Sequence, residues 1–387
     1  MRTVSIIGVG TTQFGIMEGK SLKEIATIAC NEAIKDSGID KNAIEAFYLG
    51  NFISGMLIGQ ETIAPLVANS LGLPKHVPCT KVEGACCSGG IALRHGYLLI
   101  TSGLANFVLV AGVEKMTSST TEQNTEGLAS AFDQETEGRA GLTFPGFFAL
   151  IARRHMYQYG TKIEHLGLVS VKNHNNSTVN PRARFRNEVT LQEVMASRMV
   201  ADPLKLYDCC PISDGAAAAV LCSSEIAYHF HKKPIDILAS TQTTGYSTTY
   251  DMEDPTSLIA TITAARTAYG VSHLSPGDID VAELHDCFTI AEIVDSEDLG
   301  FFEKGKGGFA VEEGLTQING RIPINPSGGL ISKGHPVGAT GLGQVFEIVK
   351  QLRGEHENQI RNAEIGLTHN FGATGQLCTV NILKARG

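Results

Sequence analysis

The sequence predicts an α/β protein built from two similar halves, with a long polar segment inserted into the first half. Residues 21–50 and residues 257–284 show the same order of features: an amphipathic helix, a glycine, and an apolar strand that ends at polar residues. Both helices begin with Ser-Leu and contain Ile-Ala-Thr-Ile, which indicates a duplicated unit. Glycine supplies 42 of the 387 residues and clusters in short motifs, which is typical of tight turns rather than disorder.

The remaining elements follow from the positions of the apolar residues. Residues 1–8 carry one positive charge and a short apolar run, which predicts a buried first strand rather than a signal peptide. The first helix is expected to end at Gly38 and its counterpart at Gly270. The continuous apolar run at 215–221 predicts a strand buried on both faces. Residues 367–375 read as a strand that runs into a glycine-rich turn.

Residues 118–211 interrupt this pattern with polar and charged segments. Insertions that follow strands of an α/β sheet commonly shape the binding site, so we expect an inserted loop domain there. The chain then divides into an N-terminal half at 1–117, completed by 212–231, the inserted segment, and a C-terminal half at 232–387.

Composition excludes several classes of function. A net charge of −9 and a pI near 5.8 argue against a nucleic-acid partner. No apolar run is long enough to span a bilayer, and the last residues match no peroxisomal or retention signal. The nine cysteines form no C-x-x-C pair and no zinc-ribbon spacing, so we expect a cytoplasmic protein with reduced thiols and no metal site.

Cys86 is the strongest candidate for a chemical role. It stands in a turn of small residues, 84–90, directly before a helical pattern. At the first turn of a helix, free N–H groups and the helix dipole lower the pKa of a thiol, which predicts a thiolate at neutral pH. The same N–H groups can hold an oxyanion. An isolated cysteine here would more simply be a packing residue, as we expect for Cys87, so the assignment depends on companion residues.

Two further motifs supply these companions. His335 lies between Gly334 and Pro336 in a glycine-dense loop, which leaves it little rotational freedom and suits a general base or an oxyanion donor. His285 and Cys287 follow the second strand of the C-terminal half, at the edge where α/β active sites assemble. Their spacing would place both on one side of a strand. A metal pair is the alternative, but no other ligands are in register.

Together with the glycine-rich turn at 367–375, these motifs resemble the thiolase superfamily over essentially the whole chain. The C-x-S-G nucleophile turn lies at 86–89, and the N-x-x-G-G…G-H-P-x-G-A-T-G block spans 325–341. Residues 112–117 are similar to the family's G-x-E-x-M-S strand end. The resemblance implies the thiolase fold: two duplicated βαβαβαββ halves in a five-layered α-β-α-β-α arrangement, plus an inserted loop domain.

Two departures indicate one branch of the superfamily. Most thiolases have Asn-Glu-Ala-Phe where this chain has His-Asp-Cys-Phe at 285–288, and a C-x-G motif where this chain has His-Asn-Phe-Gly at 369–372. This combination resembles the sterol carrier protein 2-type thiolases and the related archaeal and bacterial acetoacetyl-CoA thiolases. In that branch the second catalytic cysteine moves to the His-Asp-Cys-Phe loop. Cys378, further along the last strand, is expected to be a packing residue.

The resemblance implies a role for each residue. Cys86 would be the acylated nucleophile, His335 its activator, and Cys287 the acid/base at the carbon α to a thioester. His335 and His285 would stabilise the enolate oxygen. The backbone N–H groups of Cys86 and Gly372 would hold the tetrahedral oxyanion, with His335 as a further donor.

The remaining candidates concern the pocket and coenzyme A. His369 and Asn370 could line the pocket, and we favour a role for His369 in orienting its loop. Because coenzyme A carries phosphates, an acidic protein must gather positive charge locally to bind it. The inserted segment offers a basic group for this purpose: Lys172, His174, Arg182, Arg184 and Arg186. Of these, we favour the stretch 182–186 as a group.

The resemblance implies reversible Claisen condensation of two acetyl-CoA to acetoacetyl-CoA and coenzyme A, with thioester substrates and no bound cofactor. It also implies a homodimer or homotetramer, and leaves open an assembly with HMG-CoA synthase and a small OB-fold protein. A C-acyltransferase with another acceptor is an alternative. A ketosynthase would not need Cys287, and a non-catalytic scaffold would have lost Cys86 or His335.

Overall fold

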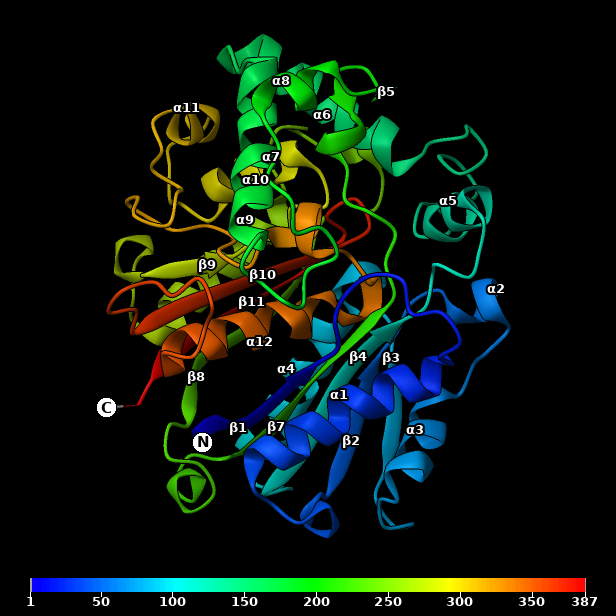
Figure 1. The fold of residues 1–387 in the computed structure, drawn as a ribbon, viewed down its shortest axis with the longest axis vertical. Coiled ribbons are helices and arrows are strands. Elements are labelled where there is room, and N and C mark those ends of the chain that lie inside the picture. Colours follow the sequence, from blue (N-terminus) through cyan, green and yellow to red (C-terminus); the bar gives the residue numbers. More distant parts are fainter. Residues whose placement is uncertain (1, 387) are drawn as a thin grey trace.

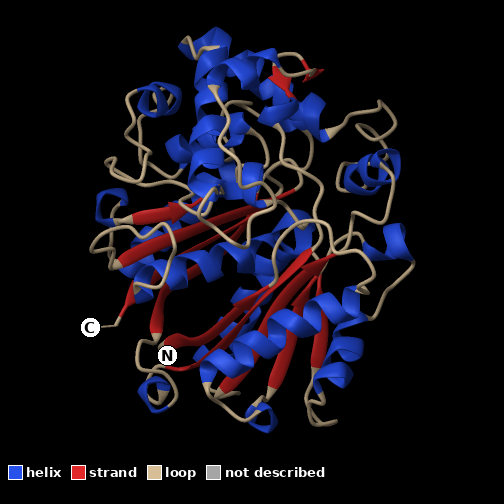
Figure 2. Cartoon of the chain, in the orientation of Figure 1, coloured by secondary structure: helices blue, strands red, loops and turns tan. Residues whose placement is uncertain are grey.

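The computed structural model describes residues 2–386 as a duplicated α/β fold (Figures 1 and 2). The N-terminal half consists of β1 (Val4–Thr11), α1 (Leu22–Ser37), β2 (Ala46–Gly50), α2 (Ser54–Ile58), α3 (Ile63–Leu71), β3 (Cys79–Val82), α4 (Ser88–Thr101), β4 (Phe107–Glu114) and β7 (Gly215–Ser223). The C-terminal half consists of β8 (Ile235–Thr244), α9 (Ile259–Ser272), β9 (Val281–Glu283), α10 (Thr289–Asp298), α11 (Gly307–Glu312), α12 (Thr340–Arg353), β10 (Ile365–Gly372) and β11 (Leu377–Ala385).

The strands of the two halves repeat one pattern. Within the described residues, the main sheet has the order β3-β2-β4-β7-β1-β8-β11-β10-β9. In the first half β2 pairs parallel with β4, which pairs antiparallel with β7, and β7 pairs antiparallel with β1. In the second half β9, β10, β11 and β8 repeat these orientations. Among the described residues, the strands of the two halves pair through three residue pairs, between Val4–Ile6 of β1 and residues 235–237 of β8.

Helices cover the strands in layers, as Figure 1 shows. Helices α1 and α3 pack on one face of the first-half strands, and α9 packs on β8 and β11. Between the two groups of strands, α4 and α12 pack against each other; α4 contacts β4 and β2, and α12 contacts β10 and β7. The order helix–strand–helix–strand–helix confirms the predicted five-layered thiolase fold. Strand β7 is buried along its whole length because helices lie on both of its faces, as its apolar run predicts.

The predicted end of the first helix is confirmed, but that of its counterpart is wrong. Ser21 and Glu24 form a capping box at the start of α1, and Gly38 ends the helix in the left-handed conformation, with φ 71°. Helix α9 instead continues through Gly270, and His273 takes the left-handed position, with φ 57°. A glycine inside a helix costs only about 1 kcal/mol, so it need not end one.

The inserted segment packs on the C-terminal half. It contains α5 (Thr121–Ala129), α6 (Phe144–Tyr159), α7 (Ile163–Ser177), α8 (Leu191–Ala196) and the hairpin of β5 (Met199–Ala201) with β6 (Leu204–Lys205). Apolar residues of α6 and α7 share one buried cluster with α9 and α10. Residues from the insert therefore lie close to the loops of the C-terminal half. The exact domain boundaries stay a prediction.

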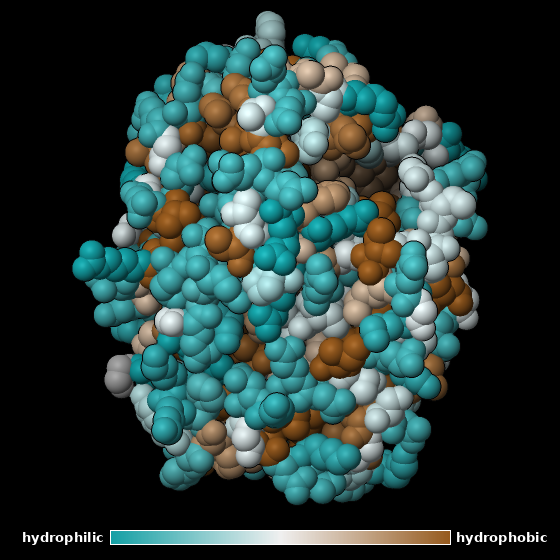
Figure 3. All heavy atoms as spheres, in the orientation of Figure 1, coloured by the Kyte–Doolittle hydropathy of each residue, from teal (hydrophilic) through white to brown (hydrophobic). Residues whose placement is uncertain are grey.

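The outer surface is mostly polar. On the face drawn in Figure 3, hydrophilic side chains dominate and apolar side chains form separate patches. Along residues 2–386, no helix combines the length and the apolar character needed to cross a membrane.

Candidate active site

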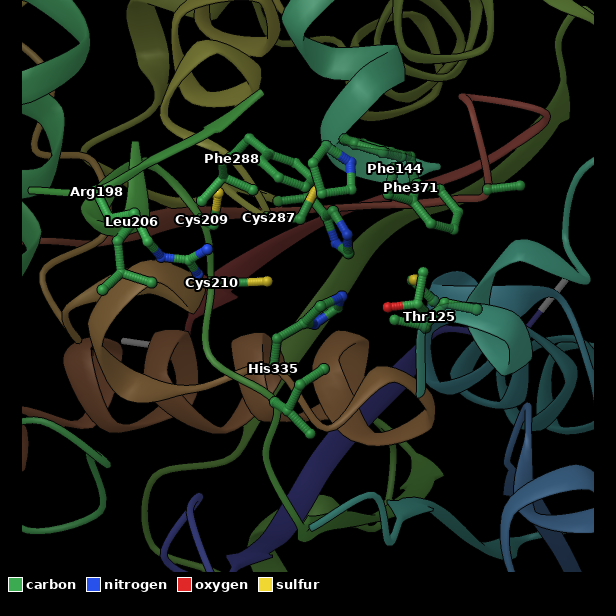
Figure 4. A pocket seen from close by; sticks show the side chains of 17 residues that line it. Thr125, Phe144, Arg198, Leu206, Cys209, Cys210, Cys287, Phe288, His335 and Phe371 are labelled. Atoms are coloured by element: carbon green, nitrogen blue, oxygen red, sulfur yellow. The ribbon is translucent and has the colours of Figure 1, made fainter. Parts of the chain in front are cut away.

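A cavity of about 230 Å³ lies where the two halves and the insert meet (Figure 4). The four side chains predicted to be catalytic all line it: Cys86, His285, Cys287 and His335. The sulfur of Cys86 and one ring nitrogen from each histidine lie within 4.8 Å of one another. This spacing would also suit a metal ion, so the expected absence of a metal stays a prediction.

The turn that carries Cys86 is held by local hydrogen bonds. Residues 85–87 form a short 3-10 turn that leads directly into α4. The Ser88 hydroxyl accepts from the Gly84 N–H at 3.0 Å and donates to the Ala85 carbonyl at 2.6 Å. Cys86 is only 7% exposed, and it faces the cavity at the start of the helix.

Burial, rather than the helix, dominates the pKa of Cys86. Removal of the thiol from water raises its pKa to about 12, and the nearby Cys87 and Glu114 act in the same direction. Hydrogen bonds from the backbone N–H groups of Ala373 and of Cys86 itself lower the pKa, but by less. Burial therefore opposes the predicted resting thiolate, and the thiol needs a proton acceptor when it reacts.

His335 has the geometry of such an acceptor. Its Nδ1 lies 2.7 Å from the Thr340 hydroxyl, which itself donates to the Pro336 carbonyl at 3.2 Å. The hydroxyl then accepts from an Nδ1–H, which leaves the Nε2 of His335 without a proton. Burial lowers the pKa of His335 to about 3, so the ring is neutral at pH 7.

His285 lies against His335 across the cavity. The two ring centroids are 4.9 Å apart and the rings are nearly perpendicular. Burial, followed by the neighbouring His335 and His369, lowers the pKa of His285 well below its usual value. Its Nδ1 lies 2.9 Å from the Nδ2 of Asn370, and within residues 2–386 its buried Nε2 has no hydrogen-bond partner.

Cys287 reaches the cavity from a turn rather than from a strand. Strand β9 ends at Glu283, and the Cys287 N–H donates to the carbonyl of His285 at 2.9 Å. The predicted placement of both residues along one strand is therefore wrong, although both do face the cavity. Burial, together with the neighbouring thiols of Cys210 and Cys86, raises the pKa of Cys287 well above its usual value.

The insert adds two cysteines that the sequence analysis did not place here. Cys209 pairs with Phe288 as an isolated antiparallel bridge, and the Cys210 N–H donates to the Cys287 carbonyl at 3.1 Å. Cys210 therefore lies beside Cys287, and in Figure 4 its sulfur points toward the same space as His335. The adjacent pair of cysteines just before the buried run at 215–221 was the available signal.

A buried polar frame holds the loops of the site. The Glu114 carboxylate accepts from the Phe52 N–H at 2.9 Å and from the Gly338 N–H at 3.2 Å, and burial raises its pKa to about 7. The Asp286 carboxylate accepts from the backbone N–H of Leu330 at 2.7 Å. The Asn325 side chain accepts from the Leu284 N–H at 2.7 Å. Through these bonds the glycine-dense loop is fixed to both halves.

The strand end at 369–373 lies directly behind the nucleophile. A side chain at Gly372 would place its Cβ 2.4 Å from the Gly84 carbonyl, so only glycine fits there. The next residue, Ala373, lines the cavity. His369 is fully buried, and its Nε2 lies 2.9 Å from the Thr261 hydroxyl. His369 and Asn370 lie behind the cavity wall rather than on it.

None of the basic residues predicted to bind coenzyme A lines the cavity. Lys172 is 1% exposed and contacts Glu292 at 2.8 Å, and Arg182 contacts Glu32 at 3.0 Å. Arg184 donates to the carbonyl of Ile212, and Arg186 is exposed. Among the described residues that line the cavity, the cation is Arg198, which the sequence analysis missed. Cys87 and Cys378 are fully buried outside the cavity, as predicted.

A buried thiol beside two imidazoles, at the junction of a duplicated α/β fold, suits an enzyme that transfers acyl groups through a cysteine. The family described as "Thiolase, N-terminal domain" matches residues 4–225, and "Thiolase C-terminal domain-like" matches residues 241–385. The chain therefore belongs to the thiolase family, and it is an acyltransferase.

Individual relatives agree with this placement. Acetyl-CoA acetyltransferase of Methanothermobacter thermautotrophicus is 50% identical, over 99% of this chain and 100% of the relative. Sterol carrier protein 2 of Oryctolagus cuniculus is 38% identical, over 96% of this chain and 70% of the relative, so the predicted branch is confirmed. The solved structure named Ltp2-ChsH2(DUF35) aldolase has a TM-score of 0.85 and 27% identity, over 99% of this chain and 98% of that chain.

Proposed function

We propose that the protein catalyses reversible condensation of two acetyl-CoA to acetoacetyl-CoA and coenzyme A, through an acyl group on Cys86. The observation that carries this proposal is the cluster of the Cys86 sulfur and the His285 and His335 nitrogens within 4.8 Å. Cys287 lines the same cavity, so a second thiol is in reach of a second substrate. The name acetyl-CoA acetyltransferase of the relative at 50% identity supports the acetyl substrate.

The first half-reaction acylates Cys86. Because burial raises the thiol pKa to about 12, the sulfur attacks the thioester carbonyl as His335 Nε2 takes its proton. The family resemblance assigns the oxyanion to the backbone N–H groups of Cys86 and Gly372; in the structure the N–H groups of Cys86 and Ala373 lie against the Cys86 sulfur, so Ala373 is a further donor. As the tetrahedral intermediate collapses, coenzyme A leaves with the proton from His335.

The second half-reaction forms the carbon–carbon bond. Cys287 first loses its own proton to water; as a thiolate it then removes a proton from the α carbon of the second acetyl-CoA, and the enolate attacks the acyl carbonyl on Cys86. A thiol with a raised pKa gives a thiolate that is a strong base, which suits a weakly acidic C–H bond. His285 donates its Nε2–H to the enolate oxygen, whereas His335, whose Nε2 is bare once coenzyme A has left, has no proton to donate there. Collapse releases acetoacetyl-CoA and returns the thiolate at Cys86, which takes up the proton that Cys287 gained from the substrate, so that both thiols are ready for the next cycle.

Binding of the coenzyme A phosphates needs positive charge near the cavity mouth. We propose Arg198 for this role because it is exposed and lines the cavity, and Arg186 as the exposed member of the predicted basic group. Lys172, Arg182 and Arg184 are engaged in contacts within the fold, which makes them weaker candidates.

The assembly and location of the protein remain proposals as well. A homodimer or homotetramer and a cytoplasmic location rest on the family resemblance and on the reduced cysteines, all nine of which are free. Work within a complex, with HMG-CoA synthase and an OB-fold protein, is a second possibility. The name of the similar aldolase structure, which joins Ltp2 to ChsH2(DUF35), supports a partner protein of some kind.

The test is thiolysis of acetoacetyl-CoA by the purified protein, beside Cys86→Ala and Cys287→Ala. We expect turnover by the parent and no acyl-enzyme from Cys86→Ala. Cys287→Ala should still form an acyl-enzyme with acetyl-CoA, visible by mass spectrometry, but its condensation rate should be at least about 100-fold lower than that of the parent. Near-normal turnover of Cys287→Ala would remove Cys287 from the mechanism. Absence of both thiolysis and condensation with short acyl-CoA substrates would refute the proposed reaction.

A further inference from the structure

Asn370 joins the nucleophile turn to His285, and we infer that it fixes which ring nitrogen of His285 carries the proton. The inference rests on the proposed function, in which His285 donates to the substrate oxygen. Asn370 lies on β10 and is 1% exposed. Its side-chain Nδ2 lies 3.1 Å from the Cys86 carbonyl oxygen and 2.9 Å from His285 Nδ1.

The Cys86 carbonyl sets the orientation of the amide. A carbonyl oxygen can only accept, so the atom of Asn370 that faces it must be the NH2 group. Rotating the amide by half a turn would place Oδ1 against the carbonyl, with two acceptors facing each other. The same NH2 group has a second hydrogen, and that hydrogen points to His285 Nδ1.

The orientation of the amide in turn sets the tautomer of His285. A neutral imidazole has one N–H and one bare nitrogen. Since Nδ1 accepts from Asn370, the proton of His285 lies on Nε2. This Nε2 is buried and without a hydrogen-bond partner among the described residues, and the ring lines the cavity. The site therefore holds an N–H donor that is free to meet a substrate oxygen.

The two histidines consequently hold opposite tautomers. Thr340 accepts from Nδ1–H of His335, whose Nε2 is bare, while Asn370 donates to Nδ1 of His285, whose Nε2 is protonated. One neutral ring can take the proton of Cys86 while the other donates to an oxygen. Asn370 is thus a positioning residue: it acts through His285 and does not line the cavity.

Close packing keeps the amide in place. A side chain at Gly341 would put its Cβ 2.4 Å from Asn370 Oδ1, and one at Gly90 would approach the same atom to 3.1 Å. Both glycines stand in the first turns of α12 and α4, so the starts of two helices confine the amide from one side.

Asn370→Asp tests the inference because a carboxylate accepts where the amide donates. It would draw the His285 proton to Nδ1 and leave Nε2 bare. We expect kcat for thiolysis to fall about 100-fold, as for the loss of one oxyanion donor, with KM within about threefold. For Asn370→Ala, which adds no charge, kcat should fall about tenfold. The matched control is Asn381→Asp, the same change at a buried position of β11 bonded to Thr368, which should keep kcat within about threefold.

A double-mutant cycle separates this role from a merely structural one. In a His285→Gln background the glutamine amide can donate whatever residue 370 is, so Asn370→Asp should cost less than about threefold there. An equal loss in both backgrounds would overturn the inference.

Direct observation of the tautomer tests the inference even if the thiolase activity is absent. In protein labelled with 15N-histidine, the signals of His285, assigned by their loss in His285→Gln, should report a bare Nδ1 in the parent and a bare Nε2 in Asn370→Asp. A protonated Nδ1 in the parent would refute the inference and leave the proposed reaction standing. A parent inactive in thiolysis but with the expected signals would refute only the reaction.

Discussion

Thr340→Val tests whether one hydrogen bond makes His335 a base. The Thr340 hydroxyl lies 2.7 Å from His335 Nδ1, and the side chain is 2% exposed. Valine has nearly the same shape as threonine but no hydroxyl, so Nδ1–H would lose its acceptor in the protein interior. A buried donor without a partner costs about 1–3 kcal/mol.

The ring can escape this cost only by moving its proton to Nε2. In that tautomer the nitrogen beside Cys86 carries a hydrogen and cannot accept one from the thiol. The reactive tautomer is therefore penalised by about 1.4–2.8 kcal/mol, which corresponds to a 10- to 100-fold fall in kcat. KM should change little, since Thr340 is not among the residues that line the cavity.

The assay is the initial rate of acetoacetyl-CoA thiolysis, with thermal unfolding followed in parallel to check that the variant is folded. Thr340→Ser is the matched control because it keeps the hydroxyl, and its kcat should stay within about threefold of the parent. A folded Thr340→Val protein with the kcat of Thr340→Ser would refute the assignment of the proton on His335.

Three further predictions concern pKa values and charge. Alkylation of Cys86 by iodoacetamide, mapped by peptide mass spectrometry, should accelerate up to at least pH 9, because burial raises the thiol pKa to about 12; a plateau below pH 8 would show a resting thiolate. Burial lowers the pKa of His369 to about 3 in the folded protein, whereas in the unfolded chain the ring takes up its proton near pH 6.5. The free energy of unfolding should therefore fall as the pH drops from about 6.5 toward 3. Urea unfolding at several pH values should show a slope smaller by about 1.4 kcal/mol per pH unit in His369→Gln, and an unchanged slope would contradict the buried neutral ring. Arg198→Ala should raise KM for coenzyme A about tenfold and leave kcat nearly unchanged, whereas Arg198→Lys should recover part of the loss; equal KM values would remove Arg198 from coenzyme A binding.

The sequence was sufficient to predict the fold and four of the residues that meet in the cavity: Cys86, His285, Cys287 and His335. Cys86 and His335 stand in turns where the backbone packs too closely for a side chain, so glycine is required. The glycines in the sequence therefore indicate the conformation of both turns. Residues of the insert were harder to place, because its irregular segments show no helical or strand periodicity of apolar residues. Cys210 and Arg198 reach the cavity from that path.

The burial of individual side chains was the second property that the sequence did not reveal. The basic character of Lys172 suggested a phosphate ligand, but its partner Glu292 lies on α10, far along the chain, and the pair is enclosed by the fold. The direction of the pKa shift of Cys86 could not be predicted from the sequence for the same reason. A helix start is a local feature that the sequence shows, whereas removal of the thiol from water depends on Ala373, Phe371 and other residues brought in from distant segments.

The meeting of α4 and α12 has an evolutionary consequence. These helices occupy equivalent places in the two repeats, and the turn before one carries the sulfur while the turn before the other carries the imidazole of His335. An ancestor with a single repeat would need two copies to build this junction, and both copies would present the same side chain there. In a single chain the two copies are free to differ, and this chain uses that freedom to place a nucleophile on one side of the junction and its base on the other.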